Sequence, residues 1–236
     1  MTFFTVVDLE TSGLAPPAEV VEIGWCDVEL ADGESRIGKM GATLFSAPGG
    51  IPPEVQAVHH LRPRDLTDYP ACMPWDLAHV ASCGGLAPPA ALIAHSCAME
   101  RQWFTDEITG GLPWICTLKV ASQIWPDAPG FSNSTLRYWL ELDLDPALAM
   151  PPHRAGPDAY VTAEIFRRAL DHATIEDMLA WTLEPRVLPK INFGKHRGSA
   201  WADAPADYLS WIVTKSDMDE DTKWNARREL DRRRAA

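Results

Sequence analysis

Near its beginning the chain reads Phe3-Phe4-Thr5-Val6-Val7-Asp8-Leu9-Glu10-Thr11-Ser12-Gly13-Leu14. The β-branched and aromatic residues predict a buried strand over residues 2–10, which ends in two carboxylates and a turn. Because side chains alternate along a strand, Asp8 and Glu10 face the same side. Neighbouring carboxylates repel each other and resist loss of water, and a divalent cation such as Mg²⁺ or Mn²⁺ would relieve both effects. On its own, the pattern fits equally well a strand end whose acids face water.

Length and composition are those of a globular protein with one large domain, or one domain and a small appendage. The chain has 236 residues, of which 46% are apolar, and no apolar run long enough to cross a bilayer. We therefore expect no membrane partner. The five cysteines are odd in number and lack CxxC spacing, which favours a reducing compartment and predicts a cytoplasmic protein.

The charge is divided unevenly along the chain. The formal net charge is −12, which argues against a broad electrostatic clamp for nucleic acid. Residues 186–236, however, hold 11 Lys and Arg against 8 Asp and Glu, a net of +3, so residues 1–185 carry −15. This division is expected for a cation-binding catalytic domain followed by an extension that binds the substrate. A difference of this size can also arise by chance.

Turn signals and apolar patterns divide the chain into alternating elements. They predict strands over 2–10, 19–30, 39–46, 90–95 and 114–120, and helices over 98–108, 133–142 and 158–172. The last helix has the clearest apolar stripe, with Asp158 as its N-cap. This order indicates an α/β domain with a mixed sheet flanked by helices. We expect one domain over 1–183 and, after a proline-containing linker, a small C-terminal module over 191–236.

Three polar patches fall where this fold would bring strand ends and helix starts to one cleft. The first is the pair Asp8 and Glu10. The second is Ala94-His95-Ser96-Cys97-Ala98-Met99-Glu100, and the third is His153-Arg154-Ala155-Gly156-Pro157-Asp158. Four acids and one histidine are therefore predicted to meet.

These three patches resemble the motifs of the DEDDh family of 3′–5′ exonucleases. The first motif of that family, Asp-x-Glu-Thr-x-Gly-Leu, is matched by residues 8–14. The second, Ala-His-Asn-x-x-Phe-Asp, is matched loosely by residues 94–100, and the third, His-Arg-Ala-x-x-Asp-Ala, closely by residues 153–159. Order and spacing agree over residues 2–172. The C-terminal segment, with Phe193-Gly194-Lys195-His196-Arg197-Gly198, is similar to a small module of exodeoxyribonuclease X-like members, a subgroup related to polymerase-associated proofreading subunits.

The resemblance implies a ribonuclease H-like fold and metal-dependent hydrolysis of phosphodiester bonds at a 3′ end, which releases nucleoside 5′-monophosphates. It implies two divalent cations, Mg²⁺ or Mn²⁺, held by Asp8, Glu10, Glu100 and Asp158, with His153 as the general base. Glu100 stands where the family usually has Asp and is longer by one methylene group. Ser96 replaces the common Asn, so a substrate contact or a contact at the sheet end is in question there.

Other residues are expected to bind the nucleic acid. Thr11, Ser12 and Gly13 would place backbone amides near the terminal nucleotide, and Leu14 would wedge against its base. In the tail, Lys195 and its neighbours would cradle phosphate, and arginines near the end of the chain would contact the backbone, although a solvated helix end explains those arginines equally well.

The expected substrate is DNA with single-stranded or frayed ends. An RNA-directed exonuclease remains the alternative, as does a weakly active module that binds nucleic acid or a polymerase. DNA polymerase or repair proteins are possible partners.

Overall fold

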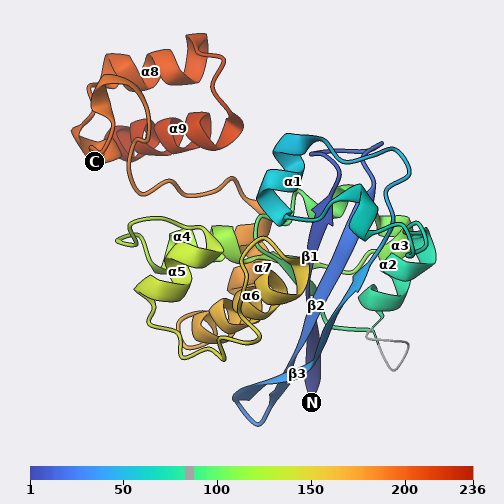
Figure 1. The fold of residues 1–236 in the computed structure, drawn as a ribbon. Helices are drawn as coiled ribbons and strands as arrows, with labels where there is room; N and C mark the ends of the chain where they lie inside the picture. The colour runs from blue at the N-terminus through green and yellow to red at the C-terminus, as the bar shows by residue number, and fades with distance from the viewer. Residues whose placement is uncertain (83–87, 236) are drawn as a thin grey trace.

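The computed structural model describes residues 1–82 and 88–235, and its centre is a five-stranded mixed sheet (Figure 1). The strands are β1 (Thr2–Thr11), β2 (Val20–Ala31), β3 (Glu34–Leu44), β4 (Leu92–Ala94) and β5 (Trp114–Cys116), in the order β3-β2-β1-β4-β5. The pairs β1–β2 and β2–β3 are antiparallel, whereas β1–β4 and β4–β5 are parallel. The predicted α/β class with a mixed sheet is confirmed.

The helices up to α7 are arranged on both faces of this sheet, whereas α8 and α9 lie away from it (Figure 1). They are α1 (Pro53–His59), α2 (Pro74–Ala81), α3 (Asp106–Thr109), α4 (Thr117–Ile124), α5 (Asn133–Trp139), α6 (Ala155–Ala169), α7 (Ile175–Leu183), α8 (Ala206–Lys215) and α9 (Glu220–Ala235). Short 3₁₀ turns cover Pro63–Asp65, Glu100–Gln102, Gly194–His196 and Trp201–Asp203.

Alternation along β1 explains why the sheet is covered on both sides. Phe4 and Val6 belong to one buried cluster, in which Phe166 of α6 packs against Phe4 with ring centroids 5.3 Å apart. Val7 and Leu9 belong to a second cluster, which contains residues of α2. Since Asp8 and Glu10 have the same parity as Phe4 and Val6, they lie on the α6 face of the sheet.

In two predicted elements part of the secondary structure is of another type than expected. The predicted helix over 98–108 is a 3₁₀ turn followed by the short helix α3, because the segment folds to bury Trp103 and Phe104 rather than to continue one helix. The predicted strand over 114–120 ends at Cys116, where α4 begins. Only the first three residues can pair with β4, because β4 is itself three residues long.

The helix predicted over 158–172 begins earlier, at Ala155, and its N-cap is Arg154 rather than Asp158. Gly156 and Pro157 both lie in the first turn of this helix. Proline is tolerated in the first helical turn because its missing N–H would have no partner there anyway. Asp158 therefore lies in the first turn, where a carboxylate interacts favourably with the helix dipole.

The last segment of the chain has a hydrophobic cluster of its own. Its buried members include Ile191, Trp201, Leu209 and Ile212, and Ala226 of α9 packs with them. Figure 1 shows α8 and α9 lying side by side, joined to the sheet by an extended stretch. Among the described residues, no helix is long and apolar enough to cross a membrane.

Candidate active site

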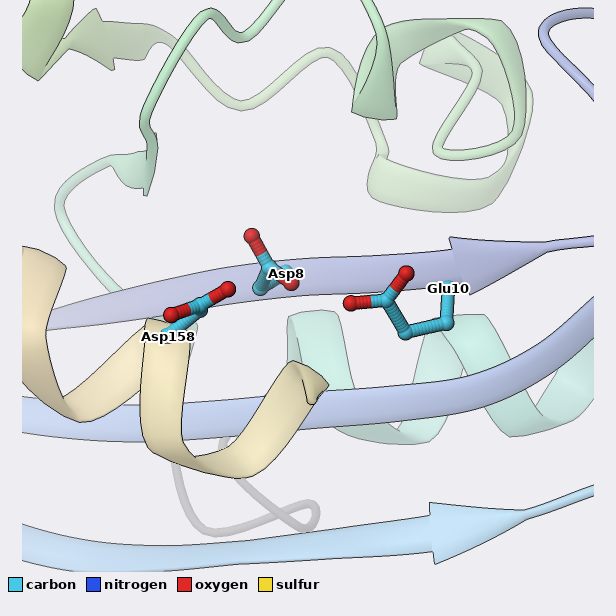
Figure 2. Close-up of side chains that lie close together, drawn as sticks. All are labelled: Asp8, Glu10 and Asp158. Atoms are coloured by element: carbon cyan, nitrogen blue, oxygen red, sulfur yellow. The ribbon is translucent and has the colours of Figure 1, made fainter. Parts of the chain in front are cut away.

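Three carboxylates converge on the α6 face of the sheet. Asp8 and Glu10 extend from β1, and Asp158 extends from the first turn of α6 (Figure 2). One oxygen from each of these half-buried side chains lies within 4.8 Å of the others. The structure thus brings together acids of the first and third patches, although Asp8 and Asp158 are 150 positions apart in the sequence.

This arrangement is electrostatically costly for the protein alone. Burial, and then the charges of Glu100, Glu10 and Asp158, hold the pKa of Asp8 well above its ordinary value. Burial also raises the pKa of Glu10 to about 8, and that of Asp158 above its usual range. Carboxylates that are this close together and partly removed from water need protons or cations to balance their charge.

Glu22 and Arg154 fix the start of α6 to the sheet. Glu22 is opposite Glu10 in the β1–β2 register and is 2% exposed. Its carboxylate accepts two hydrogen bonds from the Arg154 guanidinium, each 2.8 Å long, and a third from the Ala155 N–H at 3.1 Å. Two acids opposite each other in a sheet repel, and Arg154 offsets that repulsion.

Gly24 allows this close approach. A Cβ atom at Gly24 would lie 2.0 Å from the carbonyl carbon and oxygen of Ala155, so no larger residue fits against the helix start. Gly24 is also the β2 partner of Asp8. The same stretch of β2 therefore pairs with β1 at Asp8 and packs against the start of α6, the helix that carries Asp158.

His153 lies directly before this helix. Its backbone N–H donates to the Asp158 carboxylate over 2.9 Å, in a left-handed conformation with φ 59°. The side chain is exposed. The Asp158 contact fixes the backbone of His153 while leaving its imidazole free to meet a substrate.

Glu100 is adjacent to the three-carboxylate cluster but outside its 4.8 Å group. It is 4% exposed, lies in the 3₁₀ turn after β4, and raises the pKa of Asp8. Burial raises the pKa of Glu100 to about 8. Its Oε2 atom is buried and has no hydrogen-bond partner among the described residues. A buried carboxylate oxygen without a hydrogen-bond partner, in a side chain whose charge acts on Asp8 and Glu10, suits a cation ligand.

The rest of the second patch holds β4 in place. His95 uses both ring nitrogens, with Nδ1 2.9 Å from the Thr117 hydroxyl and Nε2 2.6 Å from the Phe131 carbonyl oxygen, and burial lowers its pKa to about 4. A neutral ring must donate from Nε2 and accept at Nδ1, so His95 is a structural residue. Ser96 is exposed and has φ 74°.

The predicted substrate contacts are divided between two places. Thr11 to Leu14 follow β1, where the Thr11 hydroxyl donates to the Gly13 carbonyl and Ser12 pairs with Glu19. Leu14 is 88% exposed, which is unusual for leucine. Lys195, by contrast, lies in the C-terminal module, in the 3₁₀ turn Gly194–His196.

Sequence reasoning missed Glu22 and Gly24. A charged residue and a glycine inside the run Val20-Val21-Glu22-Ile23-Gly24 were the available signal, since neither suits a buried strand interior. What they contact, however, lies about 130 residues further along the chain.

The site fits divalent cations. Its donors are carboxylate oxygens only, which suit hard cations such as Mg²⁺ and Mn²⁺. The raised pKa values and the unpartnered Glu100 oxygen both indicate charge that the protein does not neutralise.

Comparisons with known proteins find similar exonucleases. No family model matches the chain. Exodeoxyribonuclease 10 of Escherichia coli strain K12 is 29% identical over 217 residues, which cover 90% of this chain and 91% of that protein.

Solved structures give the same picture. Exonuclease X in complex with 5′ overhanging duplex DNA matches with a TM-score of 0.57 and 26% identity, over 76% of this chain and 99% of that one. Exonuclease I matches with a TM-score of 0.57 at 13% identity, over 77% of this chain and 43% of that one, and shows the fold alone. The ribonuclease H-like architecture is thereby confirmed.

Proposed function

We propose that this chain is a member of the DEDDh family of 3′–5′ exonucleases and removes nucleotides from the 3′ end of DNA, because it is similar to an exodeoxyribonuclease and to Exonuclease X. Single-stranded or frayed ends are the proposed substrate, and nucleoside 5′-monophosphates are the products. The convergence of Asp8, Glu10 and Asp158 within 4.8 Å carries this proposal.

Asp8, Glu10, Glu100 and Asp158 would hold two divalent cations, Mg²⁺ or Mn²⁺. When bound, such cations stabilise the charge on the attacking and leaving oxygens and lower the pKa of water. The carboxylates supply the negative charge that attracts the cations, and the Glu22–Arg154 pair keeps the Asp158 helix aligned with β1. The unpartnered Oε2 atom of Glu100 supports including this longer residue among the ligands.

His153 is the proposed general base. An imidazole can accept a proton near neutral pH and is a common general base. Its exposed imidazole, next to a backbone anchored on Asp158, supports a role in accepting the proton of the attacking water.

Residues after β1 are proposed to bind the terminal nucleotide. The exposed Leu14 side chain offers an apolar contact for a base, and its carbonyl oxygen accepts a 3.2 Å hydrogen bond from Gln102 that restrains the loop. The expected backbone contacts would come from Thr11 and Gly13, because the Ser12 N–H already donates to the Glu19 carbonyl. Ser96, after β4, would provide a polar contact.

We propose DNA rather than RNA as the substrate, because the homologue that matches over most of both chains is an exodeoxyribonuclease. We further infer a division into an exonuclease domain over 1–183 and a module over 191–236, which the separate hydrophobic cluster supports. Partnership with a polymerase or repair protein, and a cytoplasmic location, stay predictions from the sequence.

The proposal is tested with oligonucleotides labelled at the 3′ or the 5′ end, as DNA and as matched RNA, with Mg²⁺, Mn²⁺ or a chelator. We expect metal-dependent release of single nucleotides from the 3′ end of DNA, and none from the chelated protein. The Asp8→Ala variant should lose this activity, whereas Asp68→Ala, which removes an exposed acid, should keep it. Lack of metal-dependent release from every strand would overturn the proposal, and faster release from RNA would favour the alternative substrate.

A further inference from the structure

The C-terminal module carries an aromatic surface that the catalytic site does not use. Tyr208 and Trp211 lie one turn apart on α8, with ring centroids 5.8 Å apart and ring planes 23° apart. Trp211 is 43% exposed although tryptophan is the largest apolar side chain. Tyr208 is partly buried against the cluster around Leu209 and Ile212, whereas Trp211 is not among the side chains that pack on that cluster.

A short basic loop packs against the same tyrosine. Residues 191–199 form a closed loop whose base is held by hydrogen bonds from the Gly198 N–H to the Ile191 carbonyl and from the Ile191 N–H to the Ser199 carbonyl. At its tip, the His196 ring lies 4.5 Å from the Tyr208 ring, and the Lys195 ammonium lies 5.6 Å from the Tyr208 centroid. Gly194, with φ +60°, leaves room for the Tyr208 hydroxyl. We call Lys195, His196, Arg197, Tyr208 and Trp211 the aromatic–basic surface.

The charges of Lys195 and Arg197 are not neutralised by neighbouring acids. Within the described part of the chain, Lys195 and Arg197 form no ion pair and are both exposed. Most arginines of α9 are different, although Arg228 has no ion pair within the described residues and lies over the Trp224 ring instead. Arg232 and Arg233 both bind Glu229, and Arg227 and Arg234 face Glu220 and Asp231. The sequence-based expectation that these arginines grip nucleic acid is therefore weaker than the expectation for Lys195.

We propose that the aromatic–basic surface binds single-stranded DNA, with a base stacked on Trp211 and backbone phosphates beside Lys195 and Arg197. The proposal rests on the proposed function, since it assigns this surface to the same substrate. Stacked aromatic rings next to unpaired cations are the combination that binds single strands without sequence preference.

Charge complementarity supports this occupant. Residues 1–185 carry a net charge of −15, which repels a polyanion, whereas residues 186–236 carry +3. A cationic surface on the module would keep a long strand near the acidic body after each terminal nucleotide has left.

The test measures binding of a labelled 20-nucleotide dT strand to the full chain in chelator, where no nucleotide is released. Trp211→Ala should weaken binding by about 5- to 100-fold, the range for losing one stacked base. Trp211→Phe should retain most of the affinity. Lys195→Ala should reduce the slope of log affinity against log salt concentration by about one. Trp75→Ala is the matched control, because Trp75 is 65% exposed on α2, on the opposite face of the sheet from the carboxylates.

Native affinity in Trp211→Ala would overturn the proposal, as would an equal loss in Trp75→Ala or tighter binding of matched RNA than of DNA. Thermal unfolding of each variant checks that the module remains folded. The result is separable from the proposed function. A chain that binds DNA through Trp211 but releases no nucleotide overturns only the exonuclease activity. A chain that degrades DNA while Trp211→Ala binds normally overturns only this surface.

Discussion

Arg154 and Glu22 form a two-bond ion pair across 132 residues of sequence, with both N···O distances at 2.8 Å. Glu22 is almost fully buried, and it also accepts the N–H of Ala155 at the start of α6. The pair therefore determines where Asp158 stands relative to Asp8 and Glu10, although neither partner belongs to the carboxylate cluster.

We expect Glu22→Ala to lower the free energy of unfolding by about 3 kcal/mol, because it leaves a partly buried guanidinium without its partner. Activity should fall further than this loss of stability explains, since the Asp158 helix loses its anchor. Urea unfolding and nucleotide release on the same preparations check both effects. The control is Arg168→Ala, which removes an exposed pair 3.8 Å long and should change neither. Equal behaviour of the two variants would contradict the anchoring role.

Without metal, the stability of the fold should decrease as pH rises. Folding raises the pKa of Glu10 and of Glu100 to about 8, and that of Asp8 and Asp158 above the ordinary value. A raised carboxyl pKa stabilises the fold below the ordinary value, and this contribution is lost as pH rises through the folded value. In chelator, the melting temperature should therefore fall as pH rises toward about 9, and Mg²⁺ should restore it.

Glu10→Gln supplies the check on that pH dependence. In chelator at about pH 9 this variant should be more stable than the native chain, because it lacks one repelling charge, and Mg²⁺ should stabilise it less. A Glu10→Gln variant less stable than the native chain under these conditions would mean that the carboxylates do not repel one another as described.

Glu100 is the ligand whose role most needs a separate test. Glu100→Gln keeps the size of the side chain but removes the charge, so we expect nucleotide release to fall by about 100-fold or more. Glu107→Gln, on α3, is the control and should leave release unchanged. If Glu100→Gln releases nucleotides at the native rate at every Mg²⁺ concentration, Glu100 is not a ligand.

Ser96 holds a left-handed conformation, with φ 74°, that asparagine tolerates better than serine does. Ser96→Asn should raise the free energy of unfolding by about 0.5 kcal/mol or more, because it relieves this strain. Chemical unfolding measures the change, and Ser210→Asn, at an exposed position on α8, is the control. A destabilised Ser96→Asn variant would show that the serine hydroxyl, and not the backbone, decides this position.

The sequence predicted the parts of the site that local patterns determine. The strand Thr2–Thr11 follows from its β-branched run, and the acids at its end follow from the alternation of side chains. The apolar stripe predicts the main helix, although the helix begins three residues earlier than its predicted start at Asp158. Local patterns were sufficient here because the relevant contacts lie within the same element.

The remaining features depend on contacts between distant segments. The burial of Trp103 and Phe104 replaced the helix expected after Glu100, and nothing near them in the sequence determines what buries them. The Glu22–Arg154 pair and the close approach at Gly24 likewise join residues about 130 positions apart. In α9, the run of arginines suggests a surface that binds nucleic acid. Arg232 and Arg233, however, form ion pairs with Glu229 of the same helix.

The central claim is that Asp8, Glu10, Glu100 and Asp158 together hold two divalent cations. Anomalous diffraction from crystals grown with Mn²⁺ and a nucleoside 5′-monophosphate tests it most directly. The account predicts two Mn²⁺ peaks about 3.5–4 Å apart, in contact with these four carboxylates. Crystals that bind the nucleotide but show no Mn²⁺ among the four carboxylates, or an ion that Glu100 does not reach, would contradict it.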